Sequence, residues 1–360
     1  MQKKAPSTLQ DRRRGIGVPW RWLPVGCLLL LLSCAGCGNA PGGRDTSDNG
    51  GVGHGRKRGK LVVFHAASLA RPFQELERRL EAEYPGLDIV RESSSSRLAM
   101  RKITDVGRPA DIIAVADAFL LRQLMFPEHV EWVGVFARNR LVLAYTAKSR
   151  YRAEITAENW FEILLRDDVR FGYADPGMAP VGYRTHLCWK LADIHYRDRL
   201  KGRSIYEQLR SKCSQRFIRP HCNELIPLLE SLTLDYTFQY RSVALQHHLE
   251  WLKLPDEIDL GSERKGDFYA QVSVEVPGKT PGVPTKRIGH PAVYGISITK
   301  AADNPAMAEV FLKTLFGEEG RTLMEESFQE TVNPVLCSPL ENAPDSLRLY
   351  MDELGEDPCR

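Results

Sequence analysis

The chain has 360 residues and a formal net charge of only +3, with 49 Lys and Arg residues against 46 Asp and Glu residues. The two signs of charge are mixed along the sequence, and no basic stripe with interleaved aromatic residues marks a nucleic-acid-binding surface. The phosphate-loop motifs GxxxxGK[ST] and GxGxxG are also missing, which excludes nucleotide sites of those two types.

The N-terminus has the layout of a secretory signal peptide. Basic residues precede a short apolar run at residues 25–32, which is too short to span a bilayer. The letters LLSC at residues 31–34 resemble a bacterial lipobox, so we expect residues 1–33 to be removed and the thiol of Cys34 to carry a lipid. Cys37, in CAGC, is the second candidate, and a plain secretory signal or an uncleaved anchor is the alternative. The sequence thus predicts an exported protein that a lipid holds on the membrane, facing the periplasm or the cell exterior.

Residues 34–59 are rich in Gly, Asn, Asp and Ser and have almost no apolar side chains. Such a stretch cannot bury a core, so it predicts a flexible tether, with the folded part starting near Lys60. Export makes disulfides possible in that part. The cysteine spacing lacks CxxC pairs, which argues against a zinc site. Cys213 and Cys222 are close enough in sequence for a local disulfide, but the sequence does not determine which cysteines pair. The cysteines after the tether are Cys188, Cys213, Cys222, Cys337 and Cys359.

The first part of the folded chain alternates between strand and helix patterns. LVVFHAA (61–67), LDIVRE (87–92) and ADIIAVAD (110–117) have the pattern of buried strands. Apolar residues recur at helical spacing after Ser68 and again after the serine run at 93–96. The order strand–helix–strand–helix–strand predicts a parallel sheet with helices on both faces.

A second region begins at LVLAYT (141–146). Helical patterns cover residues 159–166, 182–196 and 223–232, and strand patterns return until AVYGISIT (292–299). This alternation predicts two α/β lobes, and ligands in such sheets bind beyond the carboxyl ends of the strands. The predicted division is 60–143 plus 290–345 for the first lobe, 144–289 for the second and 346–360 for a C-terminal tail, with crossings near 140–146 and 285–292.

Two polar turns share one layout. HAASL places Ser68, and SSSSR places Ser96, after a strand and at the start of a helix. Free N–H groups in the first turn of a helix carry partial positive charge, and a serine hydroxyl adds a neutral donor, so together they can hold an oxyanion. Taken singly, each serine is better explained as a helix N-cap. Because successive parallel strands end at one edge of a sheet, the pair of turns predicts an oxyanion site.

Other site chemistries fit the sequence less well. His65 lies three positions before Ser68, but a GxSxG elbow is missing, so the pair does not predict a serine hydrolase. His247 and His248 are adjacent and point in different directions, which disfavours a metal site. We expect the acidic loop DEID, which ends at Asp259, to be solvated. Since no nucleophile–base pair is legible, we expect no catalytic activity.

Eight stretches carry a family resemblance: HAASLARPF, RKITDVGRPADIIAVAD, LMFPEHVEWVGVFARNRLVLAYT, NWFEILLRDDVRFGYADP, PVGYRT, LDYTFQYRSVALQH, LPDEIDL and VYGISITK. In this order they resemble the tungstate/molybdate-binding proteins of ABC importers, in the archaeal-type branch of the periplasmic molybdate-binding family. The resemblance covers roughly residues 60–335. It implies a two-lobed periplasmic-binding-protein fold of type II, each lobe a mostly parallel sheet flanked by helices. It also implies that the protein holds a small oxyanion in its cleft and presents it to an ABC permease. We further expect a monomer without cofactor or nucleic-acid partner.

The resemblance assigns ligand-binding residues position by position. Ser68 matches a serine in the family's first turn, Ser96 matches the serine that ends the second polar turn, and Tyr240 matches a tyrosine at a strand end. The serines at 93–95 occupy positions that are usually small, so Ser96 alone is expected to supply a hydroxyl from this run.

The chain departs from the family at two carboxylates. Relatives of this branch place one carboxylate in a DDPxGYR-like motif and one in an RPKE-like motif against the metal atom, which expands its coordination toward six. Here the matching positions are Ala179, or its neighbour Met178, and Cys222. A ligand that meets only donors should stay tetrahedral, so we expect four-coordinate molybdate or tungstate. Backbone N–H groups near Val181 and Cys222 are expected to substitute for the carboxylates.

Several alternatives stay open. A disulfide between Cys213 and Cys222 would leave the cleft for another anion, and a Cys222 thiolate would place negative charge beside a dianion. Sulfate or phosphate is the alternative ligand, although phosphate is often protonated near neutral pH and calls for an acceptor carboxylate. The carboxylates of Asp175 and Glu224 are near in sequence but out of register. A sensor for such an anion on the same fold is the remaining alternative.

Overall fold

The computed structural model describes residues 59–278 and 282–355. The expected signal peptide, the two candidate lipidation sites Cys34 and Cys37, and Cys359 lie outside the described residues. Within these ranges, no helix combines the length and the apolar character that crossing a membrane requires.

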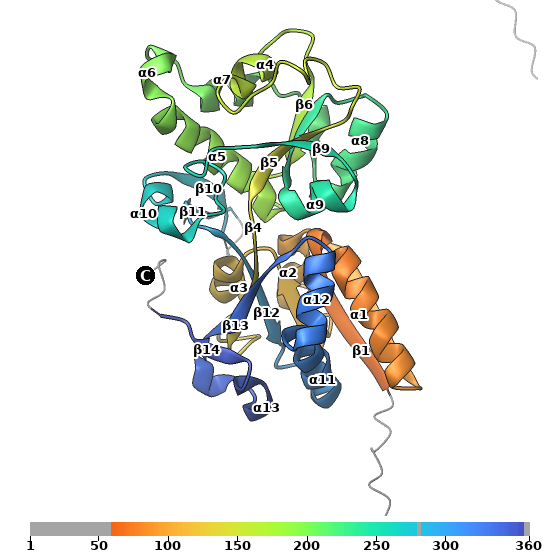
Figure 1. Ribbon diagram of the computed structural model, residues 1–360. Helices are drawn as coiled ribbons and strands as arrows, with labels where there is room; N and C mark the ends of the chain where they lie inside the picture. The colour runs from red at the N-terminus through yellow and green to blue at the C-terminus, as the bar shows by residue number, and fades with distance from the viewer. Residues whose placement is uncertain (1–58, 279–281, 356–360) are drawn as a thin grey trace, which may run out of the picture. The chain divides into compact units, whose positions relative to one another are not determined.

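Nearly all described strands belong to two sheets (Figure 1). The strands are β1 (Gly59–Ala66), β2 (Leu87–Ser94), β3 (Ile112–Val115), β4 (Val133–Asn139), β5 (Leu141–Tyr145), β6 (Phe171–Ala174), β7 (Ile218–Arg219), β8 (Tyr236–Tyr240), β9 (Glu250–Lys253), β10 (Ser273–Pro277), β11 (Pro284–Ile288), β12 (Ala292–Ile298), β13 (Glu330–Ser338) and β14 (Met351–Glu353). The larger sheet has the order β14-β13-β4-β12-β3-β1-β2, and with its helices it is called lobe I. The smaller sheet has the order β7-β6-β8-β5-β9, and with its helices it is called lobe II. Strands β10 and β11 form a separate hairpin.

Helices cover both faces of the lobe I sheet. The α-helices are α1 (Ala70–Glu83), α2 (Ser96–Thr104), α3 (Ala118–Met125), α4 (Trp160–Leu164), α5 (Pro180–His195), α6 (Arg197–Leu200), α7 (Ile205–Lys212), α8 (Ile226–Glu230), α9 (Arg241–Gln246), α10 (Gly266–Tyr269), α11 (Pro305–Phe316), α12 (Glu318–Glu326) and α13 (Asp345–Arg348). Short 3₁₀ turns are η1 (Ala67–Leu69), η2 (Gln215–Phe217), η3 (Cys222–Leu225), η4 (Glu263–Lys265) and η5 (Leu340–Asn342).

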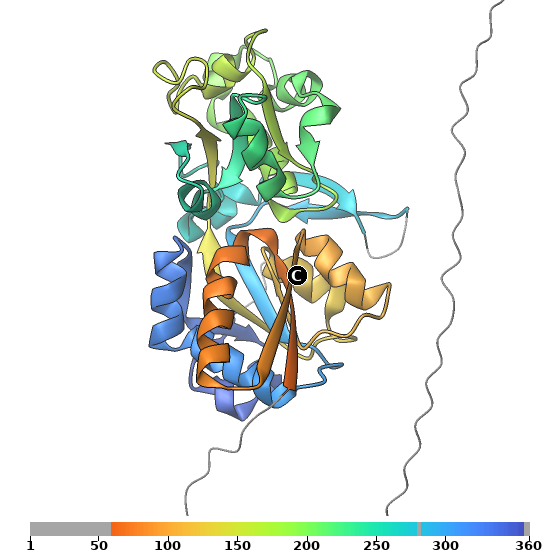
Figure 2. The same ribbon diagram turned by 90° about the vertical axis from the view of Figure 1, so that its right-hand side faces the viewer.

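Helices α1, α11 and α12 pack beside one another on one side of the lobe I sheet, and α2 and α3 contact the strands from the other side (Figure 1). In lobe II, α5 contacts β5, β6, β8 and the hairpin strand β10, and Figure 2 shows the hairpin where the lobes meet.

The two-lobed α/β fold is confirmed, but the expectation of mostly parallel sheets is wrong in detail. In lobe I, β1 pairs in parallel with β2 and β3, whereas β12 pairs antiparallel with β3 and β4. In lobe II, β6 is parallel to β7 and β8, whereas β5 is antiparallel to β8 and β9. Strands β4 and β12 are antiparallel because β4 runs toward the second lobe and β12 brings the chain back from it.

The segment after residue 345 was expected to be a tail, and its described part is instead built into lobe I. Strand β14 pairs in parallel with β13, with Val335 opposite Met351. Leu347 is fully buried and Met351 is 5% exposed, so apolar side chains hold the segment on the sheet.

Parallel pairing brings the two polar turns of the sequence to one edge of the sheet, as predicted. Strand β1 is in register with β2 from Gly59 opposite Leu87 to Ala66 opposite Ser94. Both strands therefore end at the same level, with η1 and helix α2 starting directly beyond them.

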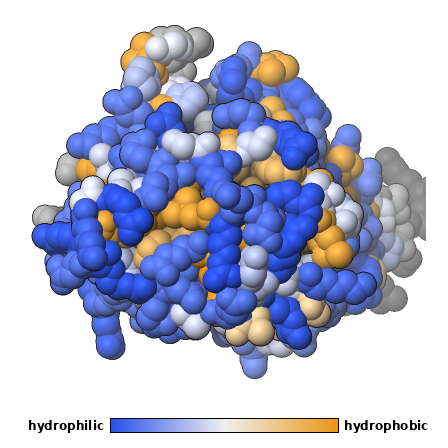
Figure 3. Space-filling view, turned by 90° about the horizontal axis from the view of Figure 1, so that it is seen from above, coloured by the Kyte–Doolittle hydropathy of each residue, from blue (hydrophilic) through white to orange (hydrophobic). Residues whose placement is uncertain are grey.

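The face of lobe II that is seen from above is largely hydrophilic (Figure 3). Apolar side chains form only small, separate areas on it. Scattered apolar residues are normal on a protein surface, so this face carries no broad apolar docking patch.

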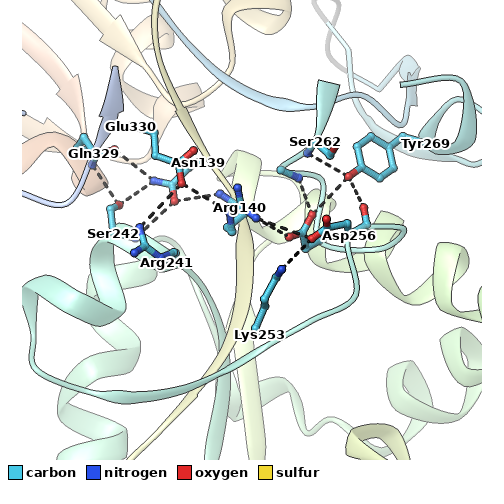
Figure 4. A network of polar contacts seen from close by, with 12 residues as sticks. Asn139, Arg140, Arg241, Ser242, Lys253, Asp256, Ser262, Tyr269, Gln329 and Glu330 are labelled. Atoms are coloured by element: carbon cyan, nitrogen blue, oxygen red, sulfur yellow. Dashed lines mark hydrogen bonds and ion pairs between the residues drawn. The ribbon is translucent and has the colours of Figure 1, made fainter. Parts of the chain in front are cut away.

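The chain passes between the sheets at Arg140, because β4 ends at Asn139 and β5 begins at Leu141. It returns through residues 289–291, between β11 and β12. Both passages fall within or beside the predicted crossings. A polar network surrounds the first one (Figure 4), where the Asn139 amide nitrogen lies 2.7 Å from the Ser242 hydroxyl.

Asp259 was expected in a solvated loop, and the structure contradicts this. Its side chain is fully buried beside the crossing strand. One carboxylate oxygen accepts from the Gly261 N–H at 2.7 Å, and the other lies 3.4 Å from the Arg140 guanidinium. The Tyr269 hydroxyl is 3.3 Å away. These donors make burial tolerable, but burial still dominates and raises the pKa of Asp259 to about 6.

Stability should therefore fall with rising pH because of Asp259. Its folded-state pKa of about 6 lies above the usual value near 4, so between these pH values the folded protein binds more protons than the unfolded chain. The free energy of unfolding then loses about 2–3 kcal/mol across this window. When the unfolding of Asp259→Asn in urea is measured at pH 4 and pH 7, the free energy of unfolding should no longer show this loss. The control Asp256→Asn changes a neighbouring, half-exposed carboxylate and should keep the pH-dependent loss of the wild type. The same pH dependence in Asp259→Asn as in wild type would show that Asp259 is not its source.

Candidate functional site

A small cavity lies between lobe I and lobe II, and all six predicted ligand-binding residues line it. Its volume is about 20 Å³. A water molecule needs about 10–15 Å³ by a comparable measure, and a pocket for a drug-sized molecule has roughly 300 Å³ or more. The cavity is thus far too small for a drug-sized molecule. The predicted residues are Ser68, Ser96, Ala179, Val181, Cys222 and Tyr240, and the other lining residues are Ala66, Ala67, Ser94, Ser95, Ala116, Pro180 and His221.

Lobe I supplies the two serines that the sequence singled out, and both are almost fully buried. Ser96 is the first residue of α2, as expected, and the N-cap position before it is Ser95. Ser68 is not a helix N-cap, because α1 begins at Ala70 after the short turn η1, and its cap position is Leu69. The Ser68 side chain is therefore not used by the helix end.

The hydroxyl groups of Ser68 and Ser96 both act as hydrogen-bond acceptors within the protein. The Ser68 hydroxyl accepts a hydrogen bond from the Tyr294 hydroxyl at 2.9 Å, and the Ser96 hydroxyl accepts from the Ala116 N–H at 3.1 Å. Each hydroxyl has one hydrogen to donate. Since the protein already uses them as acceptors, their hydrogens are left for a ligand. Two neutral donors converge here without a buried cation in the wall.

Lobe II closes the cavity with the start of α5 and the start of η3. Ala179 is the N-cap residue of α5 and Pro180 its first residue, which is a favourable place for proline. The N–H groups of this first turn, including that of Val181, face the end where an anion is favoured. Cys222 begins η3, and its carbonyl accepts from the Gln239 amide at 2.8 Å, which fixes the turn against β8.

No carboxylate and no Lys or Arg side chain is among the described residues that line the cavity. Asp175 accepts from the Gly177 N–H at 2.6 Å, and Glu224 lies 2.9 Å from the His221 ring. Both acidic groups are thus engaged elsewhere, as their sequence register suggested. Burial raises the pKa of the Tyr240 hydroxyl to about 12, so this group keeps its proton and can donate.

Cys222 is a buried free thiol, and so is Cys213. The local disulfide that the spacing allowed is therefore not formed in the structure. Burial raises the pKa of the Cys222 thiol to about 12, which disfavours the thiolate alternative near neutral pH. At this position the wall presents a neutral side chain where relatives were inferred to have a carboxylate.

The sequence reasoning missed two polar groups of the wall. Among the described lining side chains, the Ser95 hydroxyl and the Nδ1 atom of His221 are buried without a hydrogen-bond partner. Buried polar atoms are nearly always hydrogen-bonded, so these two atoms mark places where a ligand can bind. The only signal was position, because Ser95 precedes Ser96 and His221 precedes Cys222.

Direct hydrogen bonds join the two lobes around the cavity. The Asn223 side-chain amide donates to the Ala67 carbonyl at 3.2 Å, and the Arg97 N–H donates to the Met178 carbonyl at 3.3 Å. They fix the turns that form opposite walls, so the cavity exists only where both lobes contribute.

The family model for bacterial extracellular solute-binding proteins matches residues 61–328. An uncharacterised solute-binding protein of Petrotoga mobilis is 45% identical over 293 residues, covering 81% of this chain and 90% of that protein. The molybdate/tungstate-binding protein WtpA of Thermococcus kodakarensis is 38% identical over 343 residues, covering 89% and 93%.

A solved structure agrees with the fold. The sulfate-binding protein SubI of Mycobacterium tuberculosis matches with a TM-score of 0.56 at 12% identity, covering 76% of this chain and 88% of that one. At this identity the match shows a shared fold and says nothing about the ligand.

Proposed function

Because the chain belongs to the family of bacterial extracellular solute-binding proteins, we propose that it captures molybdate or tungstate outside the cytoplasm and delivers the anion to an ABC permease. The observation that carries the proposal is the cavity between the lobes, where the hydroxyls of Ser68 and Ser96 are left as donors. Tyr240 adds a third hydroxyl, and the first turns of α2 and α5 add backbone N–H groups.

The charge of the wall supports a fully ionised tetrahedral anion. A protonated anion such as hydrogen phosphate needs an acceptor for its hydrogen, and the described wall has no carboxylate to offer. Molybdate, tungstate and sulfate are all fully ionised tetrahedral anions, so sulfate is the second candidate ligand. The relatives named as molybdate/tungstate-binding proteins favour the first two.

The missing carboxylates also bear on the geometry of the bound metal. With Ala179 and the neutral Cys222 thiol at the two positions, no carboxylate oxygen among the described lining side chains is available to expand the coordination of the metal atom. We therefore expect four-coordinate molybdate or tungstate.

Calorimetric titration of the purified protein with molybdate, tungstate, sulfate and phosphate tests the proposal. Molybdate and tungstate should bind more tightly than phosphate, because the described wall has no carboxylate to accept the phosphate proton. X-ray absorption of the complex should show four oxygen neighbours. Tightest binding of phosphate, or no binding of any of the four anions, would refute the function, and six-coordinate metal would refute the donor-only site.

Export and anchoring belong to the proposal on the strength of the sequence alone. Lipid attachment at Cys34, with Cys37 as the second candidate, would place the protein on the membrane beside its permease. Fatty-acid labelling that survives in Cys34→Ser would exclude the first site. A monomer is sufficient for this role, because one chain supplies both walls of the cavity.

A further inference from the structure

A buried arginine lies behind the cavity wall and touches both lobes. Arg184, on α5 of lobe II, is fully buried. One of its guanidinium nitrogens donates to the Tyr240 hydroxyl at 2.6 Å and to the Ala116 carbonyl of lobe I at 2.5 Å. Tyr240 and Ala116 both line the cavity. Arg184 is thus one hydrogen bond away from any ligand that occupies it.

The counter-charge of Arg184 comes from the other lobe. Asp117, the N-cap residue of α3, is fully buried, and a carboxylate oxygen lies 3.5 Å from a guanidinium nitrogen. The Tyr183 hydroxyl donates to the same carboxylate, and the His290 ring is 3.6 Å away. Burial is the largest single influence and raises the pKa of Asp117, but the charges of Arg184, His290 and Arg287 and the hydrogen bond from Tyr183 together outweigh it and lower that pKa to about 2.

The contact with Arg184 decides what the Tyr240 hydroxyl can do. A guanidinium only donates hydrogen bonds, so Tyr240 must be the acceptor in this pair. Its own hydrogen is then directed elsewhere, and the cavity that it lines is the available direction. Without Arg184, the Tyr240 hydroxyl could instead donate to the Ala116 carbonyl or to Asp117.

We propose that Arg184 is a positioning residue of the anion site, which commits Tyr240 to donating toward the ligand while its pairing with Asp117 joins the two lobes. The inference rests on the proposed function, since it assumes an anion in the cavity. It assigns two separable roles to one side chain. The ion pair stabilises the arrangement of the lobes, and the bond to Tyr240 orients a ligand-binding hydroxyl.

The two roles respond differently to substitution. Removing one partner of a buried ion pair leaves an uncompensated charge, so Arg184→Met or Asp117→Asn alone should lower the melting temperature by roughly 5–10 °C. Removing both charges should recover most of this loss, because a neutral pair carries no such penalty. Asparagine keeps the capping function of position 117. The double variant therefore separates stability from positioning.

The experiment compares melting temperature and molybdate affinity in wild type, the single variants Arg184→Met, Asp117→Asn and Tyr240→Phe, the double variant Arg184→Met/Asp117→Asn and the triple variant. The double variant should recover stability yet bind molybdate about tenfold more weakly, as Tyr240→Phe should, because each lacks one donor to a charged ligand. In the Tyr240→Phe background, the double substitution should change affinity less than about twofold. Arg166→Met, which breaks an exposed pair with Glu154, is the matched control and should change neither quantity.

The outcomes distinguish this inference from the function on which it rests. Wild-type affinity in the stable double variant, or additive losses in the triple variant, would overturn the positioning role while leaving anion binding intact. A double variant that melts no higher than either single variant would overturn the interlobe pair. Absence of binding in wild type would instead remove the proposed function and the positioning role together.

Discussion

Replacing Ser68 with alanine is expected to weaken molybdate or tungstate binding by at least about tenfold. Ser68 is 2% exposed and lines the cavity, and its hydroxyl accepts a hydrogen bond from Tyr294, which leaves its hydrogen for the anion. A hydrogen bond to a charged group is worth about 1.5–3 kcal/mol, and 1.4 kcal/mol is a factor of ten in affinity. Isothermal titration calorimetry of the purified variant measures the loss directly.

Ser93→Ala is the matched control for this prediction. Ser93 belongs to the same serine run, but it is exposed and does not line the cavity, so its removal should leave the affinity unchanged. Thermal unfolding of both variants would show whether Ser68→Ala changes the fold. Equal affinities of Ser68→Ala and wild type for every anion tested would remove Ser68 from the site.

Replacing Gly182 with alanine is expected to lower the free energy of unfolding by about 3 kcal/mol, since overpacking at a rigid site costs 1–3 kcal/mol or more. A Cβ atom at this position would lie 2.2 Å from the carbonyl oxygen of Ala174 and 2.6 Å from the backbone of Asp175. Both obstacles are backbone, which no rotamer change can move away. Since Gly182 lies in the first turn of α5, relief of the clash would also displace Ala179 and Val181 from the cavity wall. Urea unfolding and anion titration should therefore both show a loss.

Gly266→Ala is the control for the effect of an added methyl group. No atom lies within 4 Å of a Cβ there, and the residue begins helix α10. Alanine loses less conformational entropy than glycine in a helix, so this variant should be neutral or more stable by up to about 1 kcal/mol. An unfolding midpoint of Gly182→Ala equal to that of Gly266→Ala would show that α5 can shift away from β6 at little cost.

The parts of the site that depend on local pattern could be predicted from the sequence. Strand and helix periodicity placed Ser68 and Ser96 at successive turns, and parallel pairing of β1 and β2 then brought the turns together. The second wall was located by resemblance, which put Ala179, Cys222 and Tyr240 in the same cavity. The ligand that these residues bind stays a prediction until it is measured.

What depends on distant partners could not be predicted. The donor role of Ser68 is set by Tyr294, which is 226 residues away. Asp259 was misjudged because its burial depends on Arg140 and Tyr269, neither of which is visible from an acidic loop. Ser95 was not predicted as a ligand-binding residue. A shift of one residue at the start of a helix decides which hydroxyl lacks a partner, and sequence patterns do not fix helix ends that closely.

The network at the strand crossing gives the anion site a mechanical connection to the rest of the molecule. The Asn139 amide nitrogen, at the point where the chain leaves lobe I, is 3.1 Å from the Tyr294 hydroxyl, which in turn donates to Ser68. Asn139 is therefore linked through Tyr294 to the hydroxyl of Ser68. A displacement of the Asn139 side chain at the crossing would thus reach Ser68, in the cavity wall, through two hydrogen bonds.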